Sequence, residues 1–451
     1  MKKRRKFTTT HIILLSFLLA ILVGAVLLML PISSSTGQAT PFVDALFTAT
    51  TATCVTGLVV VPTAVAWSVF GQVVILILIQ LGGLGIITVL AGLALVLHRK
   101  IRISDSLLLQ DAFNLNTLSG LGAFVKKVIL GTLIVEGIGA LLYMTVFVPE
   151  FGAKGIWVSV FTSVSAFCNA GIDIIKLNSL CDYAANPVIN VVTCMLIVLG
   201  GLGYIVWWDV LRVLREKKTK KGSAWRRLTL HSKIAITATA VLIASGAVLF
   251  FLLEYSNPAT MGNMSVWNKI QASVFQSVTT RTAGFFTVPQ ENLTNASSVL
   301  SLLLMFIGGS PVGTAGGIKT VTFVVLFASA LAAIKQRNDA VIFHRTLSKQ
   351  AVAKATGVAC MSFSIMFLST ILLAAVTNAS AMDIAYETVS ATATVGLSRN
   401  LTGSLNMAGK WIIIATMYLG RIGPISLAFA FNLKKQSPNI VKYPTEDISV
   451  G

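Results

Sequence analysis

The chain has 451 residues, of which 55% are hydrophobic and only 11% are charged, whereas an average soluble domain carries roughly 25% charged residues. The stretches 12–30, 70–97, 191–206 and 412–419 are nearly free of charge, which is typical of transmembrane helices of about 20 apolar residues. The net charge of +19 comes mainly from basic clusters between these stretches, which indicates a multi-pass membrane protein and argues against nucleic-acid binding.

The N-terminal segment begins with the basic residues 2–6 and continues into the apolar stretch 12–30. This stretch is longer than the apolar core of a secretory signal peptide, which has about 7–15 residues, and no small-residue cleavage site follows it. We therefore predict an uncleaved first transmembrane helix that starts in the cytoplasm.

Four polar runs along the chain, rich in Thr and Ser, each end at a glycine. These glycines are Gly57, Gly171, Gly284 and Gly396. They are 114, 113 and 112 residues apart, and the third run is one residue shorter than the other three. A period this regular indicates four internal repeats.

Each polar run lies between two apolar stretches. The preceding stretches are 12–30, 124–148, 234–253 and 361–376, and the following ones are 69–97, 188–211, 299–333 and 411–431. Each run spans about 12 residues, too few to cross a bilayer, which is the size of a re-entrant pore helix. Asp44 and Asp383 are placed at two pore-helix starts, where a carboxylate suits the helix dipole.

These observations predict an all-α membrane protein with four M1–pore helix–M2 repeats and pseudo-fourfold symmetry, that is, eight transmembrane helices. The repeats extend over residues 1–103, 104–221, 222–336 and 337–451, the last with a C-terminal tail. The basic clusters place both termini in the cytoplasm and the glycine loops outside.

The four glycine loops have the composition of an ion filter. Non-helical backbone at membrane depth is tolerated where its carbonyl groups face protein, water or an ion, and glycine permits the positive φ angles that this requires. The loops contain no carboxylate, which suits K⁺ better than a divalent cation. The predicted filter residues for K⁺ are Cys54, Val55, Thr56, Gly57, Cys168, Asn169, Ala170, Gly171, Arg281, Thr282, Ala283, Gly284, Ala393, Thr394, Val395 and Gly396.

Only the fourth run contains the Thr-Val-Gly of the TVGYG potassium-channel loop, and no run has its second glycine. We infer fewer complete carbonyl rings and hence weaker selectivity than in a true channel. Arg281 either braces the filter from behind or faces the ion path, where it would create an anion site.

The second apolar stretch of the third repeat is interrupted by residues 308–317, which contain five glycines and one proline. Such a segment cannot form a regular helix interior. We predict an intramembrane loop that gates the pore beneath the filter, with a passive kink for close packing as the alternative. Weaker breaks are expected at 82–85, 200–203 and 420–424. The predicted gate residues are Gly308, Gly309, Ser310, Pro311, Val312, Gly313, Thr314, Ala315, Gly316, Gly317, Lys319 and Arg421.

Glu136, Lys319 and Arg421 are ionisable residues at membrane depth, which makes them functional candidates. Arg421 follows Gly396 by 25 residues, which places its positive charge beneath the filter. We predict that Arg421 and the loop 308–317 form the barrier to cations, and that Glu136 pairs with one of the two cationic residues. The alternative is a purely structural buried pair.

Several motifs together resemble the superfamily of Trk, Ktr and HKT potassium transporters, over the whole chain. The motifs are CVTG at 54–57, NAG at 169–171, RTAGF at 281–285, GGSPVGTAGGIK at 308–319, TVGLS at 394–398 and GRIGP at 420–424. Eight predicted helices without an additional N-terminal pair are more similar to the bacterial Ktr membrane subunit (KtrB type) than to Trk.

The resemblance implies K⁺ uptake across the bacterial plasma membrane, stimulated by Na⁺, with the glycine loop and Arg421 controlling the gate. It also implies a homodimer that sits on a cytosolic octamer of RCK-type regulatory subunits (KtrA type), which bind ATP or ADP. This chain has no Gly-rich dinucleotide fingerprint after a strand, so the nucleotide is expected on the partner. The polar stretches 104–118 and 337–350 would rest on that ring or on membrane lipid.

Two other classes of function remain as alternatives. An enzyme is weakly supported, because no Ser/His/Asp cluster or carboxylate dyad recurs in the apolar stretches. The five cysteines, an odd number without CxxC spacing, indicate no metal site, so we expect no cofactor on this chain. An H⁺- or Na⁺-coupled potassium symporter of the Trk type is the nearer alternative, and Glu136 alone would have to serve as its proton relay.

Overall fold

The computed structural model describes residues 9–96, 121–176, 178–216, 223–337 and 339–423. Helices dominate this part of the chain, and its sheet structure is one antiparallel hairpin of β1 (Val341–Ile342) and β2 (Arg345–Thr346). The prediction of a helical fold is confirmed, except for this hairpin in the polar stretch 337–350. The basic clusters 2–6, 99–102 and 434–442, the stretch 104–118 and residues 424–431 lie outside the described residues.

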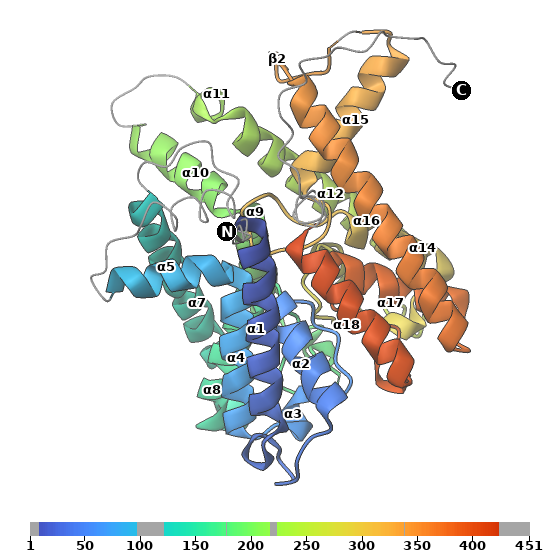
Figure 1. Cartoon of the computed structure of the whole chain (residues 1–451). Coiled ribbons are helices and arrows are strands. Elements are labelled where there is room, and N and C mark those ends of the chain that lie inside the picture. The colour runs from blue at the N-terminus through green and yellow to red at the C-terminus, as the bar shows by residue number, and fades with distance from the viewer. Residues whose placement is uncertain (1–8, 97–120, 177, 217–222, 338, 424–451) are drawn as a thin grey trace, which may run out of the picture.

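The helices follow the same order in each quarter of the chain (Figure 1). A long helix is followed by a short one and then by a broken one. The long helices are α1 (Thr9–Met29), α7 (Leu121–Phe151), α12 (Leu230–Glu254) and α16 (Lys349–Val376). The short helices are α2 (Phe42–Cys54), α8 (Lys154–Phe167), α13 (Val266–Thr279) and α17 (Ala381–Ala393). The broken ones are α4 (Val69–Leu84) with α5 (Ile86–Val96), α9 (Pro187–Leu202) with α10 (Tyr204–Glu216), and α14 (Asn295–Phe306) with α15 (Thr320–Ile334). In the fourth quarter α18 (Met407–Ile422) takes this place, and the described residues end at 423.

Short connecting elements complete the described chain. They are the helices α3 (Thr63–Ala66) and α11 (Ala224–Arg227) and the 3₁₀ turns η1 (Pro31–Ser33), η2 (Cys181–Tyr183), η3 (Gln290–Asn292) and η4 (Thr402–Ser404). The turn η1 connects the long helix α1 to the short helix α2. The other three turns and α3 connect short helices to broken ones, whereas α11 and the hairpin connect neighbouring quarters. In Figure 1, α10, α11, α15 and the hairpin lie at the upper end and α3 lies at the lower end.

The four long helices are apolar and long enough to cross a membrane, and the bent pair of α9 and α10 raises the number to five in the described residues. Their large apolar side chains point outward: Leu19, Leu141, Leu252 and Phe367 are all more than half exposed. Apolar side chains covering the outside in this way are suited to lipid and not to water.

The helices α4, α9 and α18 end at a glycine in the left-handed region. Gly85, Gly203 and Gly423 have φ angles of 83°, 84° and 86°, which glycine adopts without a steric penalty. At Gly203 the chain turns by 96° between α9 and α10. This break is sharper than the weak break predicted at 200–203, so the apolar stretch 188–211 forms two helices that meet at Gly203.

The quarters pack in a cycle. The helix that follows the short helix in each quarter contacts the short helix of the next quarter: α4 contacts α8, α9 contacts α13, α14 contacts α17, and α18 returns to α2. Figure 1 shows this closure, with α18 (red) beside α2 (blue). An ion pair of 2.6 Å between Lys410 Nζ and the Asp44 carboxylate joins the last quarter to the first.

Candidate ion filter and gate

The four loops after the short helices share one backbone conformation. Gly57, Gly171, Gly284 and Gly396 all have positive φ angles, as the sequence predicts. The residue two positions before each glycine is also left-handed, with φ between 50° and 67°: Val55, Asn169, Thr282 and Thr394. Such angles are costly for β-branched residues, so the surrounding packing must impose them.

The four glycines lie next to one another and close a ring. A Cβ atom added to any of them would come too close to the carbonyl oxygen of the residue before the next glycine. These contacts run from Gly57 to Ala170, from Gly171 to Ala283, from Gly284 to Val395 and from Gly396 to Thr56. The fourth segment thus meets the first, and no side chain fits at any of the four positions.

A hydroxyl from each short helix holds the loop that follows it. Thr51 Oγ1 accepts from the amide of Gly57 at 3.0 Å, and Ser390 Oγ accepts from the amide of Gly396 at 3.0 Å. Ser165 Oγ accepts from the amide of Ile172 at 3.1 Å, and Thr279 Oγ1 donates to the carbonyl of Phe285. These anchors explain why the runs are rich in Ser and Thr.

Two filter hydroxyls have no partner. Thr56 and Thr394 are fully buried, and neither hydroxyl oxygen makes a hydrogen bond within the described residues. A buried polar group without a hydrogen bond lowers the stability of the folded state by about 1–3 kcal/mol. Water or a ligand bound to these two oxygens would remove that cost. Neutral oxygen ligands without a carboxylate suit a monovalent cation better than a divalent one.

Asp44 and Asp383 both lie in the first turn of their short helices, as predicted. Arg399 Nε contacts the Asp383 carboxylate at 2.8 Å. Burial raises the pKa of Asp383, but hydrogen bonds from Ser380 and Arg399 prevail and hold it below its usual value. The carboxylate is therefore ionised at neutral pH and stabilises the positive end of the helix.

The loop 308–317 is a compact loop with a closed neck. Ile307 and Ile318 pair as neighbouring strands would, with the amide of Gly308 donating to the Ile318 carbonyl at 2.9 Å. The amide of Thr320 donates to the Gly309 carbonyl at 3.0 Å. The neck therefore holds both ends of the loop together.

The loop contacts three of the four filter segments. Thr314 Oγ1 lies 3.0 Å from the Asn169 side-chain oxygen and 3.0 Å from the Phe167 carbonyl, in the second segment. The amide of Gly316 donates to Thr282 Oγ1 in the third segment at 3.2 Å. A Cβ on Gly316 would collide with the hydroxyl of Thr394 in the fourth.

Arg421 ties the loop to the first quarter. Its guanidinium donates to the Thr314 carbonyl and to the Gly82 carbonyl, both at 2.7 Å. A cavity of about 630 Å³ lies on the same side, and its lining includes Arg421, Lys319 and Pro311. The loop therefore lies between the glycine ring and this cavity.

Arg281 is buried, and its guanidinium donates to the Gly308 carbonyl at 3.1 Å, on the neck of the loop. This contact favours the bracing interpretation over an anion site in the ion path. Lys319 donates to the carbonyl of Ala315 within the same loop.

Glu136 does not pair with Lys319 or Arg421, so that prediction is wrong. In the described part of the chain its carboxylate accepts from Gln80 Nε2 at 3.1 Å and from the Cys168 thiol at 3.7 Å. The physical reason is position: α7 packs on the outer side of α8 and α9, so Glu136 reaches the back of the second filter segment and not the cavity.

Removing this carboxylate is expected to lower stability. Glu136→Ala leaves the Gln80 amide without its acceptor and the Cys168 thiol with only the Gln80 side-chain oxygen, a loss of about 1–3 kcal/mol. Thermal unfolding of the detergent-purified protein measures the loss, and Glu291→Ala, at an exposed position, is the control. Equal melting temperatures for both variants would contradict the assignment.

Comparison with known proteins places this geometry in a family. Residues 3–443 match the model of the TrkH family, described as cation transport protein. The chain belongs to the TrkH family. This membership makes it a membrane cation transporter and not an enzyme.

Relatives and a solved structure resemble this TrkH-family chain along its length. It is 40% identical to Ktr system potassium uptake protein B of Bacillus subtilis (strain 168), covering 99% of this chain and 97% of the relative. It is 38% identical to the potassium/sodium uptake protein NtpJ of Enterococcus hirae, covering 100% and 99%. The crystal structure of the potassium transporter TrkH from Vibrio parahaemolyticus shares the fold, with a TM-score of 0.76 at 16% identity over 96% of this chain and 86% of that one.

Sequence reasoning missed several contacts of this TrkH-family site. Gly82 accepts from Arg421, Gln80 holds Glu136, and the backbone of Tyr204 contacts the loop. The only local signal was the Gly-Gly-Leu-Gly sequence at 82–85 and 200–203, which we interpreted as a weak break and not as a contact surface for the loop.

Proposed function

We propose that this protein takes up K⁺ across the bacterial plasma membrane through the ring of four glycines. The observation that carries the proposal is the closed ring itself, in which each glycine lies against a carbonyl group of the next segment. Backbone carbonyls and the unpaired Thr56 and Thr394 hydroxyls would replace the water around the ion. The relatives named for potassium uptake support the choice of ion.

The membrane arrangement that we propose has four M1–pore helix–M2 units, each M2 being a single span that is broken at or near a glycine. This arrangement gives eight spans and pseudo-fourfold symmetry. Basic residues in α11 and in the segment that contains the hairpin favour a cytoplasmic location for the upper end in Figure 1. The basic clusters in the sequence favour the same side for both termini.

The loop 308–317 and Arg421 form the gate in this proposal. With the loop in the observed position, an ion leaving the ring would have to displace Thr314 and Gly316 to reach the cavity. Arg421 adds a positive charge beside that route, which repels cations. Control would come from a cytosolic RCK-type octamer of the KtrA type that binds ATP or ADP and contacts a homodimer of this chain, with lipid around it.

Growth rescue tests the proposal. A bacterium deficient in potassium uptake should grow at low external K⁺ when it expresses this chain together with the partner ring, and more slowly without the ring. Rb⁺ uptake into proteoliposomes supplies the direct readout. A chain that inserts in the membrane in normal amounts but moves neither Rb⁺ nor K⁺ would overturn the proposal.

Coupling to Na⁺ is the second candidate, because one relative is named for both potassium and sodium uptake. In a coupled symporter of the Trk type, K⁺ uptake would need a Na⁺ or H⁺ gradient. Uptake driven by a K⁺ gradient alone, with equal Na⁺ and pH on both sides, would exclude obligatory coupling and leave Na⁺ a stimulating role.

A further inference from the structure

The C-terminal end of α9 is buried inside the protein, where its last carbonyl groups need partners. The loop 308–317 supplies them. The amide of Ser310 donates to the Gly201 carbonyl at 2.7 Å, and the amide of Thr314 donates to the Gly200 carbonyl at 3.1 Å. The broken helix and the loop therefore satisfy each other's backbone groups.

The start of α10 adds a third backbone bond. The amide of Tyr204, which has no partner inside its own helix, donates to the Val312 carbonyl at 3.0 Å. A Cβ on Gly203 would collide with the Pro311 carbonyl. The end of α9 and the start of α10 thus both bond to the loop. Because Tyr204 is the first residue of α10, the direction of α10 determines whether the Tyr204 amide reaches the Val312 carbonyl.

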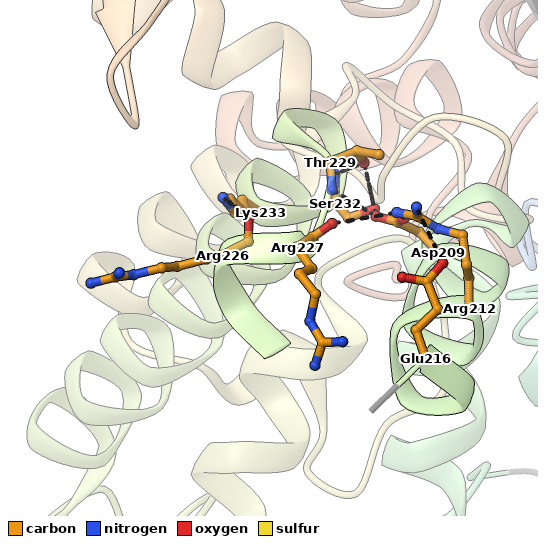
Figure 2. Close-up of polar contacts among 8 residues, drawn as sticks. All are labelled: Asp209, Arg212, Glu216, Arg226, Arg227, Thr229, Ser232 and Lys233. Carbon is orange, nitrogen blue, oxygen red and sulfur yellow. Dashed lines mark hydrogen bonds and ion pairs between the residues drawn. The ribbon is translucent and has the colours of Figure 1, made fainter. Parts of the chain in front are cut away.

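Asp209 fixes that direction (Figure 2). Its buried carboxylate accepts from the Thr229 amide and hydroxyl, both at 2.9 Å, and from Arg212 at 2.6 Å. Thr229 is the N-cap of α12, a long helix of the next quarter. The Asp209 carboxylate therefore connects α10 to the start of α12, a helix of a different quarter of the chain.

The basic side chains around this corner strengthen the tie. Arg212 also donates to the Arg227 carbonyl and Lys233 donates to the Arg226 carbonyl, both at 3.3 Å. These bonds dock α11 onto α10 and α12, as Figure 2 shows. Glu216, one turn beyond Arg212, lies 4.0 Å from the Arg212 guanidinium and belongs to the same cluster.

We propose that Asp209 is a positioning residue for the gate, which holds the bend of α9 and α10 in the shape that seats the loop 308–317. This inference rests on the proposed gating role of the loop. Without the Asp209 carboxylate, α10 is released from α12, the Tyr204 amide loses Val312, and the population of protein with an unseated loop rises. The result is faster ion flux through an unchanged filter.

Initial rates of Rb⁺ uptake into proteoliposomes test the proposal, normalised to the amount of monodisperse protein. Asp209→Asn should raise the maximal rate roughly three- to tenfold with unchanged KM, because it removes a charge-assisted hydrogen bond from the seated state. Asp209→Glu should restore part of the wild-type rate. Glu291→Gln, which removes one negative charge at an exposed position outside this cluster, is the control and should leave the rate unchanged.

A double variant tests whether Asp209 acts on ion flux through the loop 308–317. If Asp209 acts through the loop, Asp209→Asn combined with Arg421→Ala should give a smaller rise than the product of the two single effects. A product of independent effects, or an unchanged rate for Asp209→Asn beside a raised rate for Arg421→Ala, overturns the inference alone. No rise in either single variant overturns the proposed gate itself.

Discussion

Replacing Gly284 by alanine is expected to reduce K⁺ uptake by an order of magnitude or more and to abolish discrimination between K⁺ and Na⁺. Alanine at the observed φ of 86° costs roughly 1–2 kcal/mol. Its Cβ would also lie 2.7 Å from the Val395 carbonyl oxygen and 2.9 Å from Gly171 Cα. Both effects distort the ring at two neighbouring segments, and a distortion costing about 1.4 kcal/mol already changes an ion affinity tenfold.

Uptake of Rb⁺ and competition by Na⁺ in proteoliposomes measure the effect. Gly137→Ala is the control, because an added Cβ at that helical position in α7 has no neighbour within 4 Å. A Gly284→Ala protein that is folded, inserted and equally selective would show that the glycine ring is not the ion path.

Replacing Arg421 by alanine is expected to raise uptake several-fold. The change removes the hydrogen bonds to Thr314 and Gly82, and hydrogen bonds to a charged group are worth about 1.5–3 kcal/mol each. It also removes the positive charge beside the cavity. Both losses favour an unseated loop and easier passage of cations.

Arg421→Lys separates the two contributions. Lysine keeps the charge but is a point donor that cannot reproduce the forked geometry of the guanidinium. An intermediate rate would assign the barrier to both charge and geometry, and a wild-type rate would assign it to charge. Unchanged or lower uptake for Arg421→Ala, measured per folded protein, would contradict the gate.

The sequence predicted the features that depend on local composition. Four polar runs at a nearly constant period predicted the four short helices and the glycines that meet in the ring. The five glycines in 308–317 predicted the helix break between α14 and α15. Each of these signals is contained in a few consecutive residues, because glycine and hydroxyl side chains act on the backbone next to them.

The features that depend on packing between distant segments were not predictable in this way. Glu136 meets Gln80 and Cys168 across three helices, which no spacing rule revealed. Left-handed Val55 and Thr394 oppose their own conformational preference, so only the closed ring can impose that geometry. Gly-Gly-Leu-Gly at 200–203 accompanies a turn of 96°, yet the motif alone does not distinguish a slight kink from the end of a helix.

The ring also has a consequence for biosynthesis. Since Gly396 closes on the carbonyl of Thr56, a nascent chain that has released only three quarters from the ribosome leaves an incomplete circle of backbone oxygens in the bilayer, where unpaired polar groups are unfavourable. Insertion of α17 brings in the segment that completes this circle. On the proposed function, truncated products that end before residue 396 lack the fourth segment of the ring and are expected to conduct no ions.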